Sequence, residues 1–279
     1  MKKVLLIITS LFGLALTINA SKFVNLTPMP KHITVAEGAY KLPESYSINA
    51  KHLPDSICVE AEKFVQTILK TTGCKARITS KKKADIEMSL DTNLPNEGYK
   101  LSVTKKKIQI SASTTSGFFY AFQTIKKIMP AHVMAGLNPE QAQAIIPTFQ
   151  TDKRPTIPCV EIYDEPRFWY RGFMLDCGRH FFTVDEIKHI LDGMAMYKMN
   201  YFHWHLTEDQ GWRFEVKKYP RLTSIGSVAS DCRMNDMEKG YYWLGKPYGP
   251  FYYTQEDCRE IVEYARSLHI EVIPEIDMP

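Results

Sequence analysis

The stretch RGFMLDCGRHFFTVDEIKHILDGMAMYKMNYFHWHL, residues 171–206, decides the fold class because its hydrophobic pattern changes twice. Residues 172–176 are apolar enough for a buried strand. Thr183 and Glu186 then form a capping box, ahead of a helix whose apolar residues recur at three- and four-residue spacing. Residues 201–206 form a second strand. This order of strand, helix and strand indicates parallel strands with helices packed outside them.

The same pattern continues toward Pro279. Thr254 and Asp257 begin a second capped helix, and residues 270–276 follow as a third strand. The first strand is not followed by a glycine-rich phosphate turn, which argues against nucleotide binding. A closed barrel needs about 250 residues, whereas about 109 run from Arg171 to the end, enough for three of eight strands. We therefore expect an incomplete (β/α)8 TIM barrel, truncated from a longer protein.

The residues before the barrel predict an α+β N-terminal domain. Apolar residues between Ile57 and Leu69 lie on one face of a helix. Two alternating runs, 101–104 and 108–112, predict a hairpin, and a further helix is expected between Ser116 and Pro130. Prolines then mark a stiff connection. We expect an accessory domain at residues 22–155 and the first part of the catalytic barrel at residues 156–279.

Residues 1–20 have the layout of a secretory signal peptide, with two lysines, an apolar run and small residues up to Ala20. Its removal would lower the net charge from +4 to +2 through the loss of Lys2 and Lys3, too near neutral to indicate nucleic-acid binding. We expect an exported protein, periplasmic, cell-surface or secreted, with no membrane span after cleavage. The six cysteines lack the spacing of a disulfide scaffold or metal site, and we expect mostly buried thiols.

Polar residues cluster where the three barrel strands end, which is the end at which such barrels carry their active sites. Each has a structural alternative, such as a simple ion pair between Asp176 and Arg179. His203 and His205 share one strand face and could bind a metal, but spacing places no third ligand, so we expect no metal and no cofactor. The candidates are Asp176, Arg179, His180, His203, His205, Glu208, Asp209, Glu275 and Asp277.

Carboxylate pairs and aromatic residues are further candidates for sugar chemistry. Glycoside hydrolysis needs two carboxylic groups, or one acid with help from the substrate. The Asp-Glu pairs in the chain are Asp164-Glu165, in the proline-bounded connection, and Asp185-Glu186, in the first turn of a helix, where acids favour the helix dipole. Neither would lie at a strand end. Aromatic residues between Tyr241 and Tyr253 could stack on sugar rings or simply pack within a loop.

Three motifs resemble family 20 glycoside hydrolases, the β-N-acetylhexosaminidases. RGFMLD at 171–176, followed by RHF at 179–181, is similar to the opening barrel signature of the family. HWHLTEDQGWR at 203–213 resembles the second-strand signature, with Glu208 where Asp is commoner. EVIPEIDMP at 271–279 resembles the third. The region before the barrel is similar to the family's α+β domain, so the resemblance covers the whole chain after the signal segment.

The resemblance implies exo-acting removal of terminal non-reducing β-linked N-acetylglucosamine or N-acetylgalactosamine, with retention and with the substrate's acetamido oxygen as nucleophile. Arg171 resembles the arginine that holds the sugar hydroxyls, and Asp277 resembles an acid that supports it. His205 and Asp209 are expected to support the site. The catalytic Asp-Glu pair would lie beyond Pro279, so the 279 residues alone are expected to be inactive and poorly soluble.

The implied partner is an oligosaccharide or glycoconjugate with a terminal N-acetylhexosamine. The sequence leaves two alternatives open. One is a non-catalytic carbohydrate-binding module, and the other is a retaining glycosidase that uses two protein carboxylates about 5 Å apart.

Overall fold

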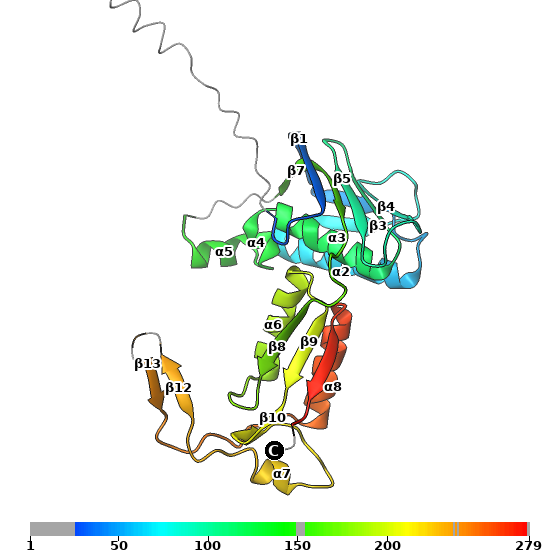
Figure 1. Ribbon diagram of the computed structural model, residues 1–279. Helices are drawn as coiled ribbons and strands as arrows, with labels where there is room; N and C mark the ends of the chain where they lie inside the picture. Colours follow the sequence, from blue (N-terminus) through cyan, green and yellow to red (C-terminus); the bar gives the residue numbers. More distant parts are fainter. Residues whose placement is uncertain (1–25, 149–153, 237, 239, 278–279) are drawn as a thin grey trace, which may run out of the picture.

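A computed structural model describes residues 26–148, 154–236, 238 and 240–277 in two units, one above the other (Figure 1). The expected signal peptide at residues 1–20 lies outside the described residues. Within the described part of the chain, none of the helices is both long and apolar enough to cross a membrane.

The first unit is built on a seven-stranded sheet in the order β1-β7-β5-β6-β4-β2-β3. Antiparallel pairing joins β1, β7, β5 and β6, and parallel pairing joins β6, β4, β2 and β3. The hairpin predicted from the two alternating runs is confirmed as β5 and β6. The strands are β1 His32–Lys41, β2 Ser45–Ile48, β3 Lys75–Ile78, β4 Ile86–Leu90, β5 Tyr99–Val103, β6 Ile108–Ala112 and β7 Thr156–Asp164.

Two long helices pack together below this sheet, and both were predicted (Figure 1). Helix α2, Asp55–Thr72, ends at Gly73, whose φ of 77° is left-handed. Helix α3, Thr115–Ile128, packs on α2 through Phe64 and Phe122, whose ring centroids are 4.6 Å apart. Short helices α4, Ala131–Met134, and α5, Pro139–Ile145, follow.

The structure moves the expected boundary between the two units. Residues 156–164 were assigned to the barrel, but they form β7, which pairs with both β1 and β5 in the first sheet. The unit therefore ends after Asp164, and the chain enters the second unit at Gly172. The prolines before residue 156 do not mark the connection between the units, because the strand that follows them, β7, pairs within the first sheet.

The second unit has the predicted alternation of strands and helices. Three parallel strands lie in the order β14-β9-β8, with helices α6 and α8 packed against each other beside them (Figure 1). Both predicted capping boxes are confirmed, at Thr183–Glu186 and Thr254–Asp257. The elements are β8 Gly172–Asp176, α6 Val184–Met196, β9 Tyr201–His205, α8 Gln255–Ser267 and β14 Glu271–Glu275.

A long excursion between β9 and α8 carries smaller elements. Strands β10, Thr207–Glu208, and β11, Gly211–Trp212, form a tight antiparallel pair. Helix α7 spans Arg221–Ser224, and strands β12, Arg233–Asp236, and β13, Gly240–Trp243, form a hairpin that extends away from the strand ends (Figure 1).

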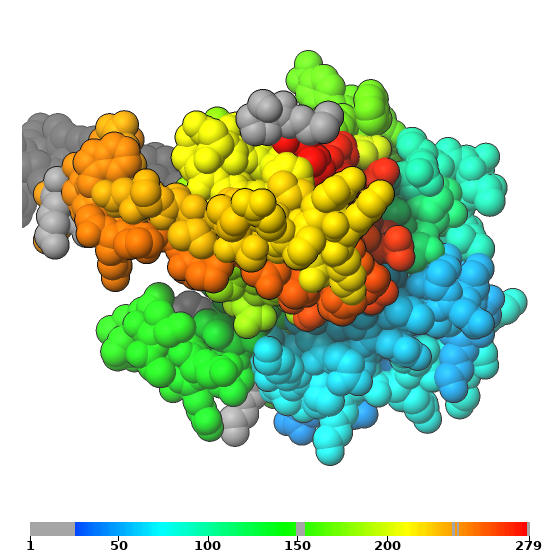
Figure 2. Space-filling view, turned by 90° about the horizontal axis from the view of Figure 1, so that it is seen from below, coloured from blue at the N-terminus to red at the C-terminus, as the bar shows by residue number. Residues whose placement is uncertain are grey.

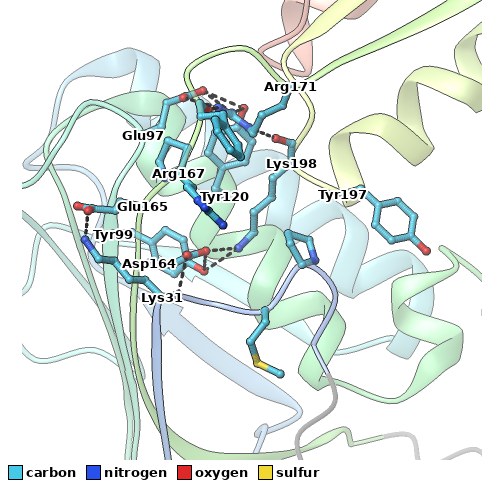
Figure 3. A pocket seen from close by; sticks show the side chains of 14 residues that line it. Lys31, Glu97, Tyr99, Tyr120, Asp164, Glu165, Arg167, Arg171, Tyr197 and Lys198 are labelled. Atoms are coloured by element: carbon cyan, nitrogen blue, oxygen red, sulfur yellow. Dashed lines mark hydrogen bonds and ion pairs between the residues drawn. The ribbon is translucent and has the colours of Figure 1, made fainter.

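The two units meet at the N-terminal ends of β8, β9 and β14. Lys198, in the turn before β9, donates to Asp164 Oδ2 over 2.7 Å and to Tyr99 OH over 2.9 Å. Arg171 donates to both carboxylate oxygens of Glu97, at 3.0 and 2.9 Å. These charged groups line a junction cavity of about 610 Å³ (Figure 3). The junction therefore occupies the end of the sheet opposite to the strands' C-terminal ends.

Candidate functional site

The C-terminal ends of β8, β9 and β14 bring together the side chains that the sequence singled out. Figure 2 views the molecule from this side, where segments that follow β9, in yellow, lie next to the red C-terminal strand. Cys177 N donates to the carbonyl of His205, and Leu206 N donates to the carbonyl of Glu275. These backbone hydrogen bonds continue the parallel pairing one residue beyond the strands, so the C-terminal ends of the three strands lie side by side.

Arg179 forms the centre of the acidic part of this group. Its Nη1 lies 2.5 Å from Asp176 Oδ2, and its Nη2 lies 2.5 Å from Glu208 Oε1. Its own backbone N also donates to Asp176 Oδ1. Burial alone would raise the pKa of Asp176, but the hydrogen bonds and charge of Arg179 outweigh it and lower that pKa. The Arg179 side chain is still 56% exposed, so its fork of donors remains accessible from solvent.

The two histidines of β9 share one carboxylate partner. His203 Nε2 and His205 Nδ1 both donate to Glu275 Oε2, over 2.7 and 2.8 Å. Both hydrogen bonds lower the pKa of Glu275, and the bond from His205 has the larger effect. Phe202 and Trp204, which alternate with the histidines, are buried on the opposite face of the strand. The expectation that both histidines lie on one strand face is confirmed.

His205, Glu208 and Asp277 form the one group of potential metal ligands found among the described residues, with ligand atoms all within 4.8 Å of one another. His205 is buried, with a side chain only 6% exposed, and its Nε2 lies 3.4 Å from Glu208 Oε1. Asp277 follows β14, and its carbonyl accepts a hydrogen bond from Thr207 Oγ1 over 2.9 Å. His203, the other histidine of the pair considered from the sequence, is not in this group and is bonded to Glu275 instead.

Arg171 does not join this group, which corrects the sequence-based assignment. It was expected to hold sugar hydroxyls and to pair with Asp277. Its guanidinium instead binds Glu97, Tyr120 OH and the carbonyls of Phe168 and Lys198 at the opposite end of β8. The reason is that Arg171 precedes the strand whereas Arg179 follows it. The position that the geometry offers to a sugar-binding arginine is that of Arg179.

The remaining candidates lie around the group or apart from it. Asp209 is exposed, and its backbone N donates to Glu208 Oε2 over 3.4 Å, so it borders the cluster without entering it. His180 packs between Phe182 and Tyr248. The aromatic residues Tyr241 and Trp243 are 68% exposed on the β12–β13 hairpin, away from the strand ends (Figure 1).

Arg213 is a structural residue whose role sequence reasoning missed. It is fully buried and its guanidinium donates only to backbone carbonyls of the loops around the site. Burial lowers its pKa, opposed by nearby tyrosine and cysteine side chains. Its position at the end of the HWHLTEDQGWR motif was the available signal. The carbonyl acceptors belong to Cys177, Gly178, Ser227 and Phe251.

Comparison with known proteins gives the same partition of the chain. Residues 24–165 match the model of Glycosyl hydrolase family 20, domain 2, and residues 168–279 match that of Glycosyl hydrolase family 20, catalytic domain. The chain is 39% identical over 271 residues to a β-hexosaminidase of Porphyromonas gingivalis, covering 92% of the chain and 30% of that protein. A Vibrio furnissii β-hexosaminidase is 34% identical over 263 residues, covering 91% of the chain and 38% of the relative.

Solved structures of similar proteins include both units. Streptomyces plicatus N-acetyl-β-hexosaminidase, in complex with Thio-NAglucal, has a TM-score of 0.74 at 30% identity, covering 91% of this chain and 46% of that one. A Vibrio harveyi exo-β-N-acetylglucosaminidase in complex with N-acetylglucosamine has a TM-score of 0.73 at 31% identity, covering 91% and 36%. The chain thus spans about a third of the length of these curated relatives. It contains their N-terminal domain and part of the TIM-barrel region.

Proposed function

This chain belongs to glycosyl hydrolase family 20, and from that premise we propose that it supplies the sugar-holding part of an exo-acting β-N-acetylhexosaminidase. The substrate is an oligosaccharide or glycoconjugate with a terminal, non-reducing, β-linked N-acetylglucosamine or N-acetylgalactosamine. The observation that carries the proposal is the convergence of Asp176, Arg179, Glu208 and Asp277 on one end of the parallel sheet. Carboxylates and a guanidinium there suit the paired hydroxyls of a sugar.

In this proposal Arg179 takes the sugar-binding role that the resemblance to the family implied for Arg171. Its two nitrogens are already oriented by Asp176 and Glu208, on two different strand ends. Because guanidinium nitrogens lie in a fixed plane, a pair of fixed carboxylates also fixes the direction of the donors that remain free. Arg179 then meets adjacent hydroxyls of the ring, and the two acids act by positioning it.

Hydrolysis proceeds with net retention and with the acetamido oxygen of the substrate as the nucleophile. The Asp-Glu pair that would orient the acetamide and protonate the leaving oxygen is not formed by the described residues. Asp164 and Glu165 lie at the junction of the units, and Asp185 and Glu186 lie in the first turn of α6. We therefore propose that these 279 residues alone do not hydrolyse the sugar.

The test compares two polypeptides on two substrates. One is this chain, and the other joins it to the remaining length of the Porphyromonas gingivalis relative, in place of the matching 30% of that protein. The substrates are p-nitrophenyl β-N-acetylglucosaminide and the matching β-glucoside, which lacks the acetamide. We expect only the chimera to act, and only on the acetamido sugar. An Arg179→Lys chimera should lose activity, whereas Arg233→Lys, in the distant hairpin, should retain it.

Each other outcome points to a different function. Cleavage of both sugars would indicate a glycosidase with two protein carboxylates. Sugar binding by a folded chimera without cleavage would indicate a carbohydrate-binding module. Hydrolysis by the 279-residue chain alone would overturn the division of roles proposed above.

Export is a separate part of the proposal, supported by the lysines and apolar run in residues 1–20. Expression with the natural N-terminus in a bacterial host should give a processed protein outside the cytoplasm, and N-terminal sequencing should start at Ser21. An unprocessed N-terminus in the cytoplasmic fraction would contradict export.

A further inference from the structure

Arg179 lies in a loop that has no regular structure of its own. Residues 177–182, the Arg179 loop, join β8 to α6 and contain no helix or strand. The Arg179 side chain is 56% exposed, so its ion pairs with Asp176 and Glu208 are open to solvent. Exposed ion pairs stabilise a conformation only weakly. The direction of the Arg179 side chain therefore also depends on how the backbone of this loop is held.

A second loop holds the residues that follow Arg179. Phe181 N donates to Tyr248 OH over 3.1 Å, and Tyr253 OH donates to the carbonyl of Phe182 over 2.5 Å. Both tyrosines belong to residues 248–253, the aromatic segment, which lies in the excursion between β9 and α8. The aromatic segment thus bonds to the backbone of two successive residues of the Arg179 loop.

Arg213 holds the residues that precede Arg179. Its Nε and Nη2 donate to the carbonyls of Cys177 and Gly178, over 3.2 and 3.0 Å. Its Nη1 donates to the carbonyl of Phe251 over 2.9 Å, and so connects the Arg179 loop with the aromatic segment. Arg213 is fully buried, and hydrogen bonds are stronger there than in water.

Two neighbours make room for this guanidinium and cover it. A Cβ atom at Gly211 would lie 2.2 Å from Arg213 Cζ, so a side chain at position 211 would displace the guanidinium. The guanidinium also lies over the ring of Tyr248, 5.8 Å from the ring centroid. Tyr248 therefore contacts both Arg213 and the Arg179 loop. Of the two uses that the sequence left open for the aromatic residues, Tyr248 has the second, packing within a loop.

We propose that Tyr248 and Arg213 are positioning residues for Arg179. They hold the backbone of the Arg179 loop on both sides of Arg179, so that its guanidinium meets Asp176, Glu208 and the hydroxyls of a terminal N-acetylhexosamine. They act through Arg179 and not on the sugar. The inference rests on the sugar-binding role proposed above for Arg179, and it extends that site to the aromatic segment.

A double-mutant cycle tests this assignment in the chimera described above, with p-nitrophenyl β-N-acetylglucosaminide as the substrate. Tyr248→Phe removes the hydroxyl that accepts from Phe181 N and keeps the ring. It should lower kcat/KM by about three- to tenfold, as expected for the loss of one neutral hydrogen bond. In the Arg179→Lys background, the same change should alter the residual kcat/KM by less than about twofold, because residues that act through one side chain are not additive.

Tyr252→Phe is the matched control. Its hydroxyl belongs to the same segment but makes no hydrogen bond with the residues that the structure describes. It should leave kcat/KM within about twofold of the parent in both backgrounds. Equal losses from Tyr248→Phe in the two backgrounds would overturn the assignment, because a general loss of folded protein lowers the activity whichever residue stands at position 179. Circular dichroism confirms that each variant is folded.

Hydrogen exchange of the same chimera separates this inference from the proposed function. Tyr248→Phe should speed the exchange of residues 177–182, whereas residues 187–193 of α6 should exchange as in the parent. Arg213→Lys should have a larger effect on the same loop, because it affects the bonds to two of its carbonyls. If the chimera cleaves no sugar, the proposed function fails, and exchange still decides whether Tyr248 holds the Arg179 loop. Unchanged exchange of residues 177–182 in Tyr248→Phe would overturn the positioning role.

Discussion

Replacement of Asp164 by Asn tests how the two units are joined. Asp164 ends β7, and its carboxylate accepts hydrogen bonds from Lys198 Nζ, Tyr99 OH and Lys31 N. The Lys198 and Asp164 side chains are only 10% and 12% exposed. Burial lowers the pKa of Lys198, and the charge and hydrogen bond of Asp164 oppose this shift, so Asp164 favours the charged form of the lysine. Asn would keep the shape and remove the charge.

The cost follows from leaving a buried ammonium without its counter-ion. Breaking a buried pair by loss of one partner destabilises a protein by about 3–5 kcal/mol. For a chain of this size, that corresponds to a decrease in Tm of roughly 6–20 °C. Because Lys198 belongs to the second unit and Asp164 to the first, we also expect one unfolding transition in the wild type to separate into two in the variant.

Denaturant unfolding followed by circular dichroism measures this cost at pH 7 and at pH 9.5. Loss of Asp164 lowers the folded-state pKa of Lys198 further. The unfolded state of the variant then binds more protons than its folded state over a wider pH range. Because stability rises with pH in that range, the variant gains stability as the pH rises. The difference from the wild type should therefore be smaller at pH 9.5. Asp91→Asn, which removes an exposed partner of Lys100, should leave stability nearly unchanged. A cost for Asp164→Asn below about 1 kcal/mol, or one independent of pH, would refute the reasoning.

Three further predictions concern single side chains. Burial would raise the pKa of Glu60, but His269 and Lys63 lower it overall. The contribution of Glu60 to the free energy of unfolding is therefore complete above about pH 5 and is lost as the pH falls. Glu60→Gln should lose less stability than the wild type on acid titration. Arg213→Lys should lower the free energy of unfolding by more than about 2 kcal/mol, because a lysine cannot reach four separate carbonyls. An unchanged midpoint of denaturant unfolding would show that these hydrogen bonds do not stabilise the loops. Thr254→Ala should cost about 1 kcal/mol through loss of the α8 cap, and Thr254→Ser should restore it.

Local signals in the sequence were sufficient for much of the fold. The capping boxes of α6 and α8 were predicted because their hydrogen bonds join the side chains and backbone N–H groups of residues only three positions apart. The β5–β6 hairpin was predicted because both strands alternate with period two around a short turn. Strand β7 shows the limit, since its pairing with β1 joins residues more than a hundred positions apart. No local pattern distinguishes that partner from a barrel strand.

The site was predicted as a set of residue types but not as an arrangement. The prediction that polar residues meet at the strand ends is confirmed for Asp176, His205, Glu208 and Asp277. The role given to Arg171 came from the resemblance to the family and was wrong. The predicted strand at residues 172–176 already placed Arg171 before the strand, at the end of the sheet opposite to the active face. The Glu97 carboxylate that binds Arg171 comes from another unit, and charge complementarity over that distance leaves no sequence signal.

The length of β8 sets the distance between two arginines. Arg171, before the strand, binds Glu97 of the first unit, and Arg179, after the strand, binds the carboxylate of Asp176. At about 3.3 Å per residue, the five residues of β8 act as a spacer of roughly 16 Å. A one-residue insertion there would turn every later side chain of the strand to its other face. Natural length variation should therefore avoid β8, and any transplant of the Arg179 loop onto another barrel would need to bring both the strand and its anchor.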